Sequence, residues 1–371
     1  MGLNRIRLGD YITRSTTNNH DLQYGMDLIT GVTNEGIFTN PKGDPIEVDL
    51  KPYKIVNNGA FVYNPTRIDL GSIAYRTEGL CIVSHLYIIF YLNEKGKKII
   101  NPNWLYIYFR RDEFRREVRF RNFGSQRPEF SFNDMSDIEI LLPDITIQQK
   151  YVAIYNAMVV NQQSYERGLK DLKLSIDAFL DKIKHESKAQ SVGELLKEVD
   201  YRNENGEIVN VQGININKQF MPSVADTFGV NLKNYKVVRK GQFAYSGMQT
   251  GRDECIRIAL YADEDPIIIS PAYSVFNVKN TSVLAEYIMV WFSRAESDRR
   301  GWFMSDSSIR TNLYLDRFYE IKIPLPDKKM QDSIVELYSA YLARRKISEH
   351  LKAQIKDICP ILIKGSLEEG Q

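Results

Sequence analysis

The feature that most constrains this chain is an internal repeat with an offset near 183 residues. Gly9 and Gly193 open two similar segments at an offset of 184, and residues 54–63 recur as residues 236–245 at an offset of 182. Unrelated segments would not keep one offset along a whole chain, so the sequence predicts two copies of one domain.

The repeated segments predict strands. Residues 54–63 contain an apolar run, a glycine and a second apolar run, which is typical of a strand, a turn and another strand. Residues 138–143 and 321–326 each predict a strand that leads into a helix. Elsewhere the two copies share little beyond aromatic, helix-like stretches at 104–109 and 287–292. The scaffold is therefore repeated, while its variable part is not.

A long helix is predicted after each copy, because apolar residues there advance by threes and fours. One narrow stripe on each helix is typical of a two-helix coiled-coil pair, although such a stripe also fits a helix facing the core of a single domain. Pro360 predicts the end of the second helix. Helices of about 30 to 40 residues would reach roughly 45 to 60 Å, which suits a spacer. The residues expected in the helix or partner interface are Ile147, Tyr151, Ile154, Met158, Leu172, Ile176, Phe179, Met330, Ile334, Leu337, Tyr341, Leu351 and Ile355.

Composition indicates an ordinary globular protein, with 43% hydrophobic and 26% charged residues in 371. No run approaches the roughly 20 apolar residues of a membrane span, and the start resembles no secretory signal, so we expect a cytoplasmic protein. The three cysteines lie far apart, and the four histidines show no metal-ligand spacing. These patterns favour reduced thiols and predict neither disulfides nor a metal site.

No motif for catalysis is evident. The sequence has no GxGxxG loop for a nucleotide cofactor and no GxxxxGK[ST] loop for ATP. Asn64-Pro65-Thr66 is similar to the segment with which adenine methyltransferases hold their target, but the second proline and the aromatic residue are missing. We therefore expect a non-catalytic chain that binds no cofactor itself.

Arginines dominate the stretch 110–121, and together with Arg127 they number seven against three acids. Arginine suits both phosphates and guanine edges, although a solvated helix face would explain such a run equally simply. Basic residues recur at the same stage of the second copy. Arg127 and Arg310 occupy matching places, where they could hold a loop or touch a phosphate. The residues expected to contact DNA are Arg67, Arg76, Arg115, Arg116, Arg119, Arg121, Arg127, Gln249, Arg252, Arg299, Arg300 and Arg310.

Over nearly its whole length the chain resembles the specificity subunits of type I restriction-modification systems. The resemblance is carried by Leu8-Gly9-Asp10, by residues 57–65, and by the strand at 138–143 that leads to Gln148-Gln149, with residues 321–326 and Gln331 in the same places of the second half. It implies two recognition domains held apart by antiparallel helices, each reading one half of a split, asymmetric target in double-stranded DNA. It also implies partners: two adenine-N6 modification subunits that carry S-adenosylmethionine, and restriction subunits that use ATP for translocation.

The prediction is thus an α+β protein with target-recognition domains at 1–146 and 189–327 and helical spacers at 147–188 and 328–371. The second spacer comprises a helix to residue 360 and a tail. Three alternatives stay open: a recognition module that serves another catalytic partner, a self-associating scaffold without a DNA role, and an independent methyltransferase or nuclease.

Overall fold

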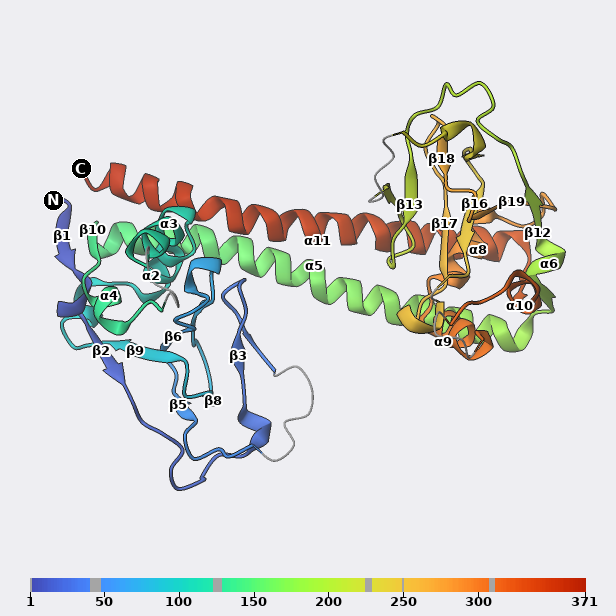
Figure 1. Cartoon of the computed structure of the whole chain (residues 1–371). Helices are drawn as coiled ribbons and strands as arrows, with labels where there is room; N and C mark the ends of the chain where they lie inside the picture. The colour runs from blue at the N-terminus through green and yellow to red at the C-terminus, as the bar shows by residue number, and fades with distance from the viewer. Residues whose placement is uncertain (1, 41–47, 123–128, 224–228, 249, 307–310) are drawn as a thin grey trace. The chain divides into compact units, whose positions relative to one another are not determined.

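Strand pairing repeats from one half of the chain to the other in the computed structural model, which describes residues 2–40, 48–122, 129–223, 229–248, 250–306 and 311–371 (Figure 1). The chain forms two units, unit 1 from residues 1–164 and 347–371 and unit 2 from residues 165–346. Unit 1 therefore draws on both ends of the chain, and unit 2 on its middle.

Among the described residues, the first copy contains ten strands and five α-helices, the last of which extends into unit 2. Its strands are β1 (Asn4–Arg7), β2 (Ile12–Ser15), β3 (Gly31–Val32), β4 (Phe38–Thr39), β5 (Lys54–Val56), β6 (Phe61–Tyr63), β7 (Ile73–Tyr75), β8 (Cys81–Val83), β9 (Ile88–Leu92) and β10 (Glu139–Leu142). Its helices are α1 (Gly96–Ile99), α2 (Pro102–Phe109), α3 (Asp112–Arg121), α4 (Phe132–Ser136) and the long α5 (Ile145–Glu186), with short 3-10 turns η1 (Leu8–Asp10), η2 (Met26–Leu28) and η3 (Ile68–Leu70).

The strands of the second copy follow the same order among its described residues, while its short helices differ in part from those of the first. Its strands are β11 (Ala189–Ser191), β12 (Leu196–Val199), β13 (Gln212–Ile214), β14 (Phe220–Pro222), β15 (Lys236–Val238), β16 (Phe243–Ser246), β17 (Arg257–Leu260), β18 (Ile267–Ile269), β19 (Ser274–Val278) and β20 (Lys322–Pro324). Its helices are α6 (Val192–Leu195), α7 (Thr250–Asp253), α8 (Ala285–Phe292), α9 (Ala295–Met304), α10 (Leu315–Glu320) and α11 (Lys328–Glu369), with the 3-10 turn η4 (Leu232–Asn234).

Sheet topology is the same in both units. Unit 1 has a four-stranded antiparallel sheet in the order β2-β9-β6-β7, and unit 2 has one in the order β12-β19-β16-β17. The three two-stranded pairings also correspond. In unit 1 they are β1-β10, β3-β4 and β5-β8, and in unit 2 they are β11-β20, β13-β14 and β15-β18. Gly59 and Gly241 turn the chain between matched strands with φ of 87° and 81°, a conformation that favours glycine. The predicted strand, glycine turn and strand are confirmed in both copies.

Aromatic side chains fill a core in each unit. In unit 1, Phe61 and Phe90 of the sheet pack with Phe109 of α2, and Ile363 of α11 belongs to the same buried cluster. In unit 2, Phe243, Phe276, Phe292 and Phe318 are fully buried together with Leu180 of α5. Each sheet is thus covered by a short aromatic helix and by the long helices, which explains the aromatic stretches in the sequence.

A buried glutamine joins the same three segments in each unit. The Gln148 side chain accepts from the Asn101 backbone N–H at 2.8 Å, and it donates to the carbonyls of Ile99 at 2.9 Å and Pro143 at 2.8 Å. Gln331 makes the three equivalent bonds, accepting from Leu284 at 3.0 Å and donating to Ser282 at 3.3 Å and Pro326 at 3.0 Å. The long helices therefore start from matched anchors.

Helices α5 and α11 run antiparallel within each unit. In unit 1 the Lys150 ammonium group pairs with Glu369 at 2.7 Å, so the start of α5 meets the end of α11. In unit 2 the Arg344 guanidinium lies over the Tyr165 ring at 5.2 Å. Each helix has 42 residues. The predicted fold class, two tandem mixed domains with long helices, is confirmed.

One prediction about the helices was wrong, namely where the second one ends. Pro360 lies inside α11 instead of ending it. Proline removes one helical hydrogen bond, but Cys359 and Ile363 beside it are buried in the core of unit 1, and this packing carries the helix onward. The expected stripe also drifts: the side chains of Ile154 and Phe179 are 44% and 45% exposed, whereas Leu180 is buried. A straight α-helix rotates by about 20° per seven residues relative to an exact heptad repeat, so a stripe of residues spaced by threes and fours moves around the helix along its length.

Candidate nucleic-acid interface

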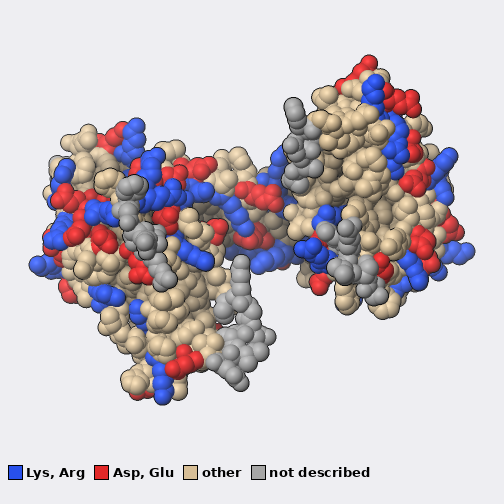
Figure 2. Space-filling view, in the orientation of Figure 1, with Lys and Arg blue, Asp and Glu red and all other residues tan. Residues whose placement is uncertain are grey.

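Helix α3 of unit 1 carries four of the eleven predicted DNA-contacting arginines, and acids on the same helix pair with three of them. Arg115 lies 3.2 Å from Asp112, Arg116 lies 3.3 Å from Glu113, and Arg121 lies 2.9 Å from Glu117. Spacings of three and four residues place these charges side by side on one helix. Figure 2 shows acidic atoms interspersed among the basic ones on unit 1. Any phosphate that binds here must compete with these pairs, of which the exposed pair of Arg116 with Glu113 is weak.

Two arginines of the same run point inward. Arg110 is 9% exposed and donates to the carbonyls of Gly71 and Asn34 at 2.6 and 3.2 Å. The Arg115 side chain is 14% exposed, and burial, with Arg110 nearby, lowers its pKa. Arg119 reaches Asp69 of η3 at 3.5 Å. This end of the run therefore fixes α3 to the loop at 69–71, while Arg116 and Arg119 stay exposed.

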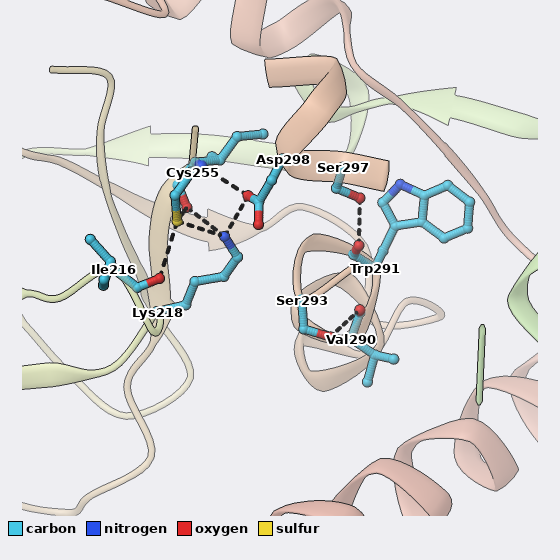
Figure 3. Close-up of polar contacts among 9 residues, drawn as sticks. Ile216, Lys218, Cys255, Val290, Trp291, Ser293, Ser297 and Asp298 are labelled. Atoms are coloured by element: carbon cyan, nitrogen blue, oxygen red, sulfur yellow. Dashed lines mark hydrogen bonds and ion pairs between the residues drawn. The ribbon is translucent and has the colours of Figure 1, made fainter. Parts of the chain in front are cut away.

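Helix α9 of unit 2 carries Arg299 and Arg300, and its position is fixed by the residue before them. The Asp298 carboxylate accepts from the Lys218 ammonium group at 2.6 Å and from the Ile256 backbone N–H at 2.9 Å (Figure 3). Lys218 also lies 3.2 Å from the Cys255 sulfur. Arg299 pairs with Glu296, and Arg300 lies over the Phe303 ring at 5.7 Å. A buried contact thus holds the helix that presents both arginines.

Arg294, which precedes α9, is buried in unit 2. Its side chain is 5% exposed, pairs with Asp181 and lies 3.8 Å from Asp177, both on α5. Arg294 also lies over the Trp291 ring at 4.8 Å, and Arg111 at the matched place of unit 1 makes the same kind of contact with the Tyr108 ring at 3.8 Å, so the two arginines differ in the pair that Arg294 forms with α5. A charge run in sequence does not reveal which of its members fasten the helix to its own domain.

The remaining predicted contacts are spread over loops. Arg67 is exposed beside η3, and Arg252 is exposed on α7. Neither side chain makes a hydrogen bond or ion pair with a described residue. Arg76 lies over the Phe38 ring at 5.1 Å and lines a recess of about 280 Å³ with Asp27 and Thr30. Arg127, Gln249 and Arg310 lie outside the described residues.

Sequence reasoning missed a basic recess in unit 1. It measures about 370 Å³ and is lined by Arg14 of β2, Lys54 of β5 and His85 of the β8–β9 turn, together with Asn64, Pro65, Thr66, Leu86, Ile88, Glu129, Ser131 and Phe132. These residues are scattered along 120 positions and are assembled by strand pairing. Asn64-Pro65-Thr66, which the sequence singled out, forms part of this wall.

A comparison with protein families decides what kind of chain this is. The model of the type I restriction modification DNA specificity domain matches residues 9–170 and again residues 195–357. The chain belongs to this family.

Type I specificity subunits supply DNA sequence specificity and are not themselves catalytic, so the same holds for this member. Such subunits act with DNA and with modification and restriction subunits. Among the described residues, no group of three or more histidines, cysteines or acids could hold a metal ion. In the same part of the chain, no helix combines the length and apolarity needed to cross a bilayer.

Solved structures support the fold of this specificity subunit. The S subunit of the type I restriction-modification system from M. genitalium aligns with a TM-score of 0.57 at 12% identity, over 100% of this chain and 96% of the other. A chain from a study of complex assembly and conformational transition of the type I R-M system aligns at 0.50 and 14% identity, over 99% and 98%. A search of curated proteins found no match.

The predicted interface residues of the long helices fall into three groups in this specificity subunit, which are buried, exposed and half-buried. Ile176 and Ile334 are buried in unit 2, whereas Ile154, Phe179 and Met330 are 44%, 45% and 38% exposed. The half-buried positions are Ile147, Tyr151, Met158, Leu172, Leu337, Tyr341, Leu351 and Ile355. The buried group serves the chain's own core, and the exposed group is available for a partner.

Proposed function

We propose that this specificity subunit recognises a bipartite, asymmetric target in double-stranded DNA. The supporting observation is that the two units share one topology while their exposed side chains differ at matched places, as where Arg14 of β2 is replaced by Glu198 of β12. A repeated scaffold with different side chains would read two different half-sites. The two recognition domains correspond to residues 1–146 and 189–327, and the helical spacers to 147–188 and 328–371.

Affinity would come mainly from phosphate neutralisation, and specificity from side chains in the dissimilar segments. The exposed residues Arg67, Arg116 and Arg252 are the best placed of the predicted contacts, because solvent reaches their side chains. Of these three, Arg116 has an ion pair, with Glu113 at 3.3 Å. Arg127, Gln249 and Arg310 remain predicted contacts.

The chemistry would belong to the partners. Two adenine-N6 modification subunits would carry S-adenosylmethionine, and restriction subunits would use ATP to translocate DNA. Ile154, Phe179 and Met330 offer apolar surface on the long helices where a modification subunit could dock. This chain would bring the partners to the target and bind neither cofactor.

Mapping N6-methyladenine across a host genome, with and without this chain, tests the proposal. We expect one split motif to lose methylation when the chain is absent. Replacing residues 1–146 with those of a relative should then change one half of that motif and leave the other half and the spacing intact. A change in both halves, or no lost motif, would contradict the proposal.

A further inference from the structure

The basic recess of unit 1 contains two cations without acidic partners. Arg14 is exposed, and neither it nor Lys54 forms an ion pair with any described residue. Most other arginines of unit 1 that reach the surface do have such a partner, as Arg5 has in Glu139 at 3.4 Å. Arg14 therefore presents an uncompensated charge where the surface is concave.

Hydrogen-bond donors converge on the same space. The Lys54 ammonium group donates to the Tyr87 carbonyl at 2.7 Å, which leaves two of its three donors unused. The Asn64 side-chain oxygen accepts from the backbone N–H of Thr66 at 3.0 Å and from its hydroxyl at 2.8 Å, which leaves the amide NH₂ to donate. Burial lowers the pKa of Lys54, and the charge of Arg14 lowers it further. An anion between the two groups would offset the repulsion between Arg14 and Lys54.

Acids do little to neutralise the recess. Glu129 is the one acid among its described lining residues, and it is exposed. Asp134 lies near the wall, but its carboxylate accepts from the Ser131 hydroxyl and backbone N–H at 2.6 and 2.8 Å. Arg14 and Lys54 thus outnumber the acid that lines the recess, before His85 is counted.

The matched place in unit 2 has the opposite character. Strand pairing aligns Lys236 with Lys54, and Glu198 takes the place of Arg14. The Lys236 ammonium group lies 3.9 Å from Glu198 and 4.0 Å from Asp200, and Arg202 pairs with Asp200 at 2.7 Å. Both of these described cations have an acid beside them, so they have no comparable demand for an anion.

We propose that the recess lined by Arg14, Lys54 and Asn64 binds one phosphodiester group of the DNA backbone, and that the matched place in unit 2 binds none. This inference rests on the proposed function and deepens it, since the two half-sites would then contribute unequally to binding. Unit 1 would hold its half-site partly through this one phosphate.

Salt dependence of DNA binding tests the proposal. The full-length chain is titrated against a fluorescent duplex that carries the mapped target, over 50 to 200 mM salt, as wild type, as Arg14→Gln and as Lys54→Gln. Each neutralised phosphate contributes about 0.9 to the slope of log K against log salt. We expect Arg14→Gln to reduce the slope by about 0.9, so that wild type loses about 3.5 times more affinity than the variant over this range. The control Arg5→Gln removes a charge that Glu139 already compensates, and it should leave the slope unchanged.

Neutral phosphates locate the contact. Methylphosphonate is placed at single positions of each half-site in turn. One substitution in the half-site read by unit 1 should weaken wild type and have no further effect on Arg14→Gln. An unchanged slope in Arg14→Gln, or a reduction equal to that of Arg5→Gln, overturns the proposal while wild-type binding upholds the proposed function. Failure of wild type to prefer the mapped target overturns the proposed function itself.

Discussion

Lys54 and Lys236 occupy the same strand position in the two units, yet their neighbours differ in sign. Lys54 faces Arg14 and donates to a backbone carbonyl, whereas Lys236 is 7% exposed and lies near Glu198 and Asp200. The backbone pairing that supports both lysines is antiparallel and corresponds strand for strand. The comparison indicates that the two copies share their main-chain pairing, whereas the side chains around it differ.

The largest effects should come from the feature that the two units share. Gln148→Ala and Gln331→Ala each leave a buried N–H and two carbonyls without partners, and we expect each to cost about 2 to 4 kcal/mol of unfolding free energy. Hydrogen exchange measured on peptides of each unit would separate the two losses. The exposed neighbours offer controls, Gln149→Ala and Asp332→Ala, which should change little. If one variant reduced hydrogen-exchange protection equally in both units, the idea that each glutamine anchors its own unit would be contradicted.

A medium effect should separate the units at Arg294 and Arg111. Arg294→Ala removes a buried guanidinium that pairs with Asp181, and we expect unit 2 to lose about 1 to 2 kcal/mol, a value reduced because the Asp181 side chain is 61% exposed. Arg111→Ala loses only its contact with Tyr108, so we expect less than about 1 kcal/mol in unit 1. Urea unfolding of both variants, followed by hydrogen exchange, measures the contrast. Similar losses would show that the Asp181 pair adds nothing.

The smallest effect should have opposite signs at a matched pair of tyrosines. The Tyr245 hydroxyl donates to the Leu313 carbonyl at 2.6 Å, whereas the buried Tyr63 hydroxyl has no hydrogen-bond partner among the residues that the structure describes. We expect Tyr245→Phe to cost about 1 kcal/mol and Tyr63→Phe to be neutral or stabilising. Thermal unfolding of the two variants gives the signs. Destabilisation by Tyr63→Phe would mean that its hydroxyl is satisfied in solution, and the contrast between the units would disappear.

Sequence patterns predicted most of the fold because main-chain pairing leaves a record in apolar residues and turn glycines. The strands at 54–63 and 236–245 and the aromatic helices α2 and α8 could be predicted in this way. Pro360 misled because the local cost of a proline is visible in sequence, whereas the burial of Ile363 beyond it is not. The helical stripe was displaced at Phe179 because a repeat of threes and fours does not fix the phase over 42 residues.

The candidate site was less predictable, for a different physical reason. A run of arginines reports composition, and only the packing shows that Arg110 turns toward Gly71 while Arg116 stays exposed. Arg14, Lys54 and His85 come from three separate segments, so no window of sequence contains them together. The repeat itself held a usable signal, because Glu198 stands where the first copy has Arg14. Aligned positions at which the charge changes sign between copies can therefore indicate a site that no motif marks.

Unit 1 is built from the first 164 residues and the last 25, and this arrangement sets an order of events during synthesis. Trp104 in its core donates to the hydroxyl of Ser366 at 3.0 Å, and Ile363 is fully buried beside it. The ribosome adds these two partners of Trp104 after it has made every residue of unit 2. The domain that is begun first is therefore the last that can be completed, and until then the nascent chain exposes the apolar surface that α11 will cover.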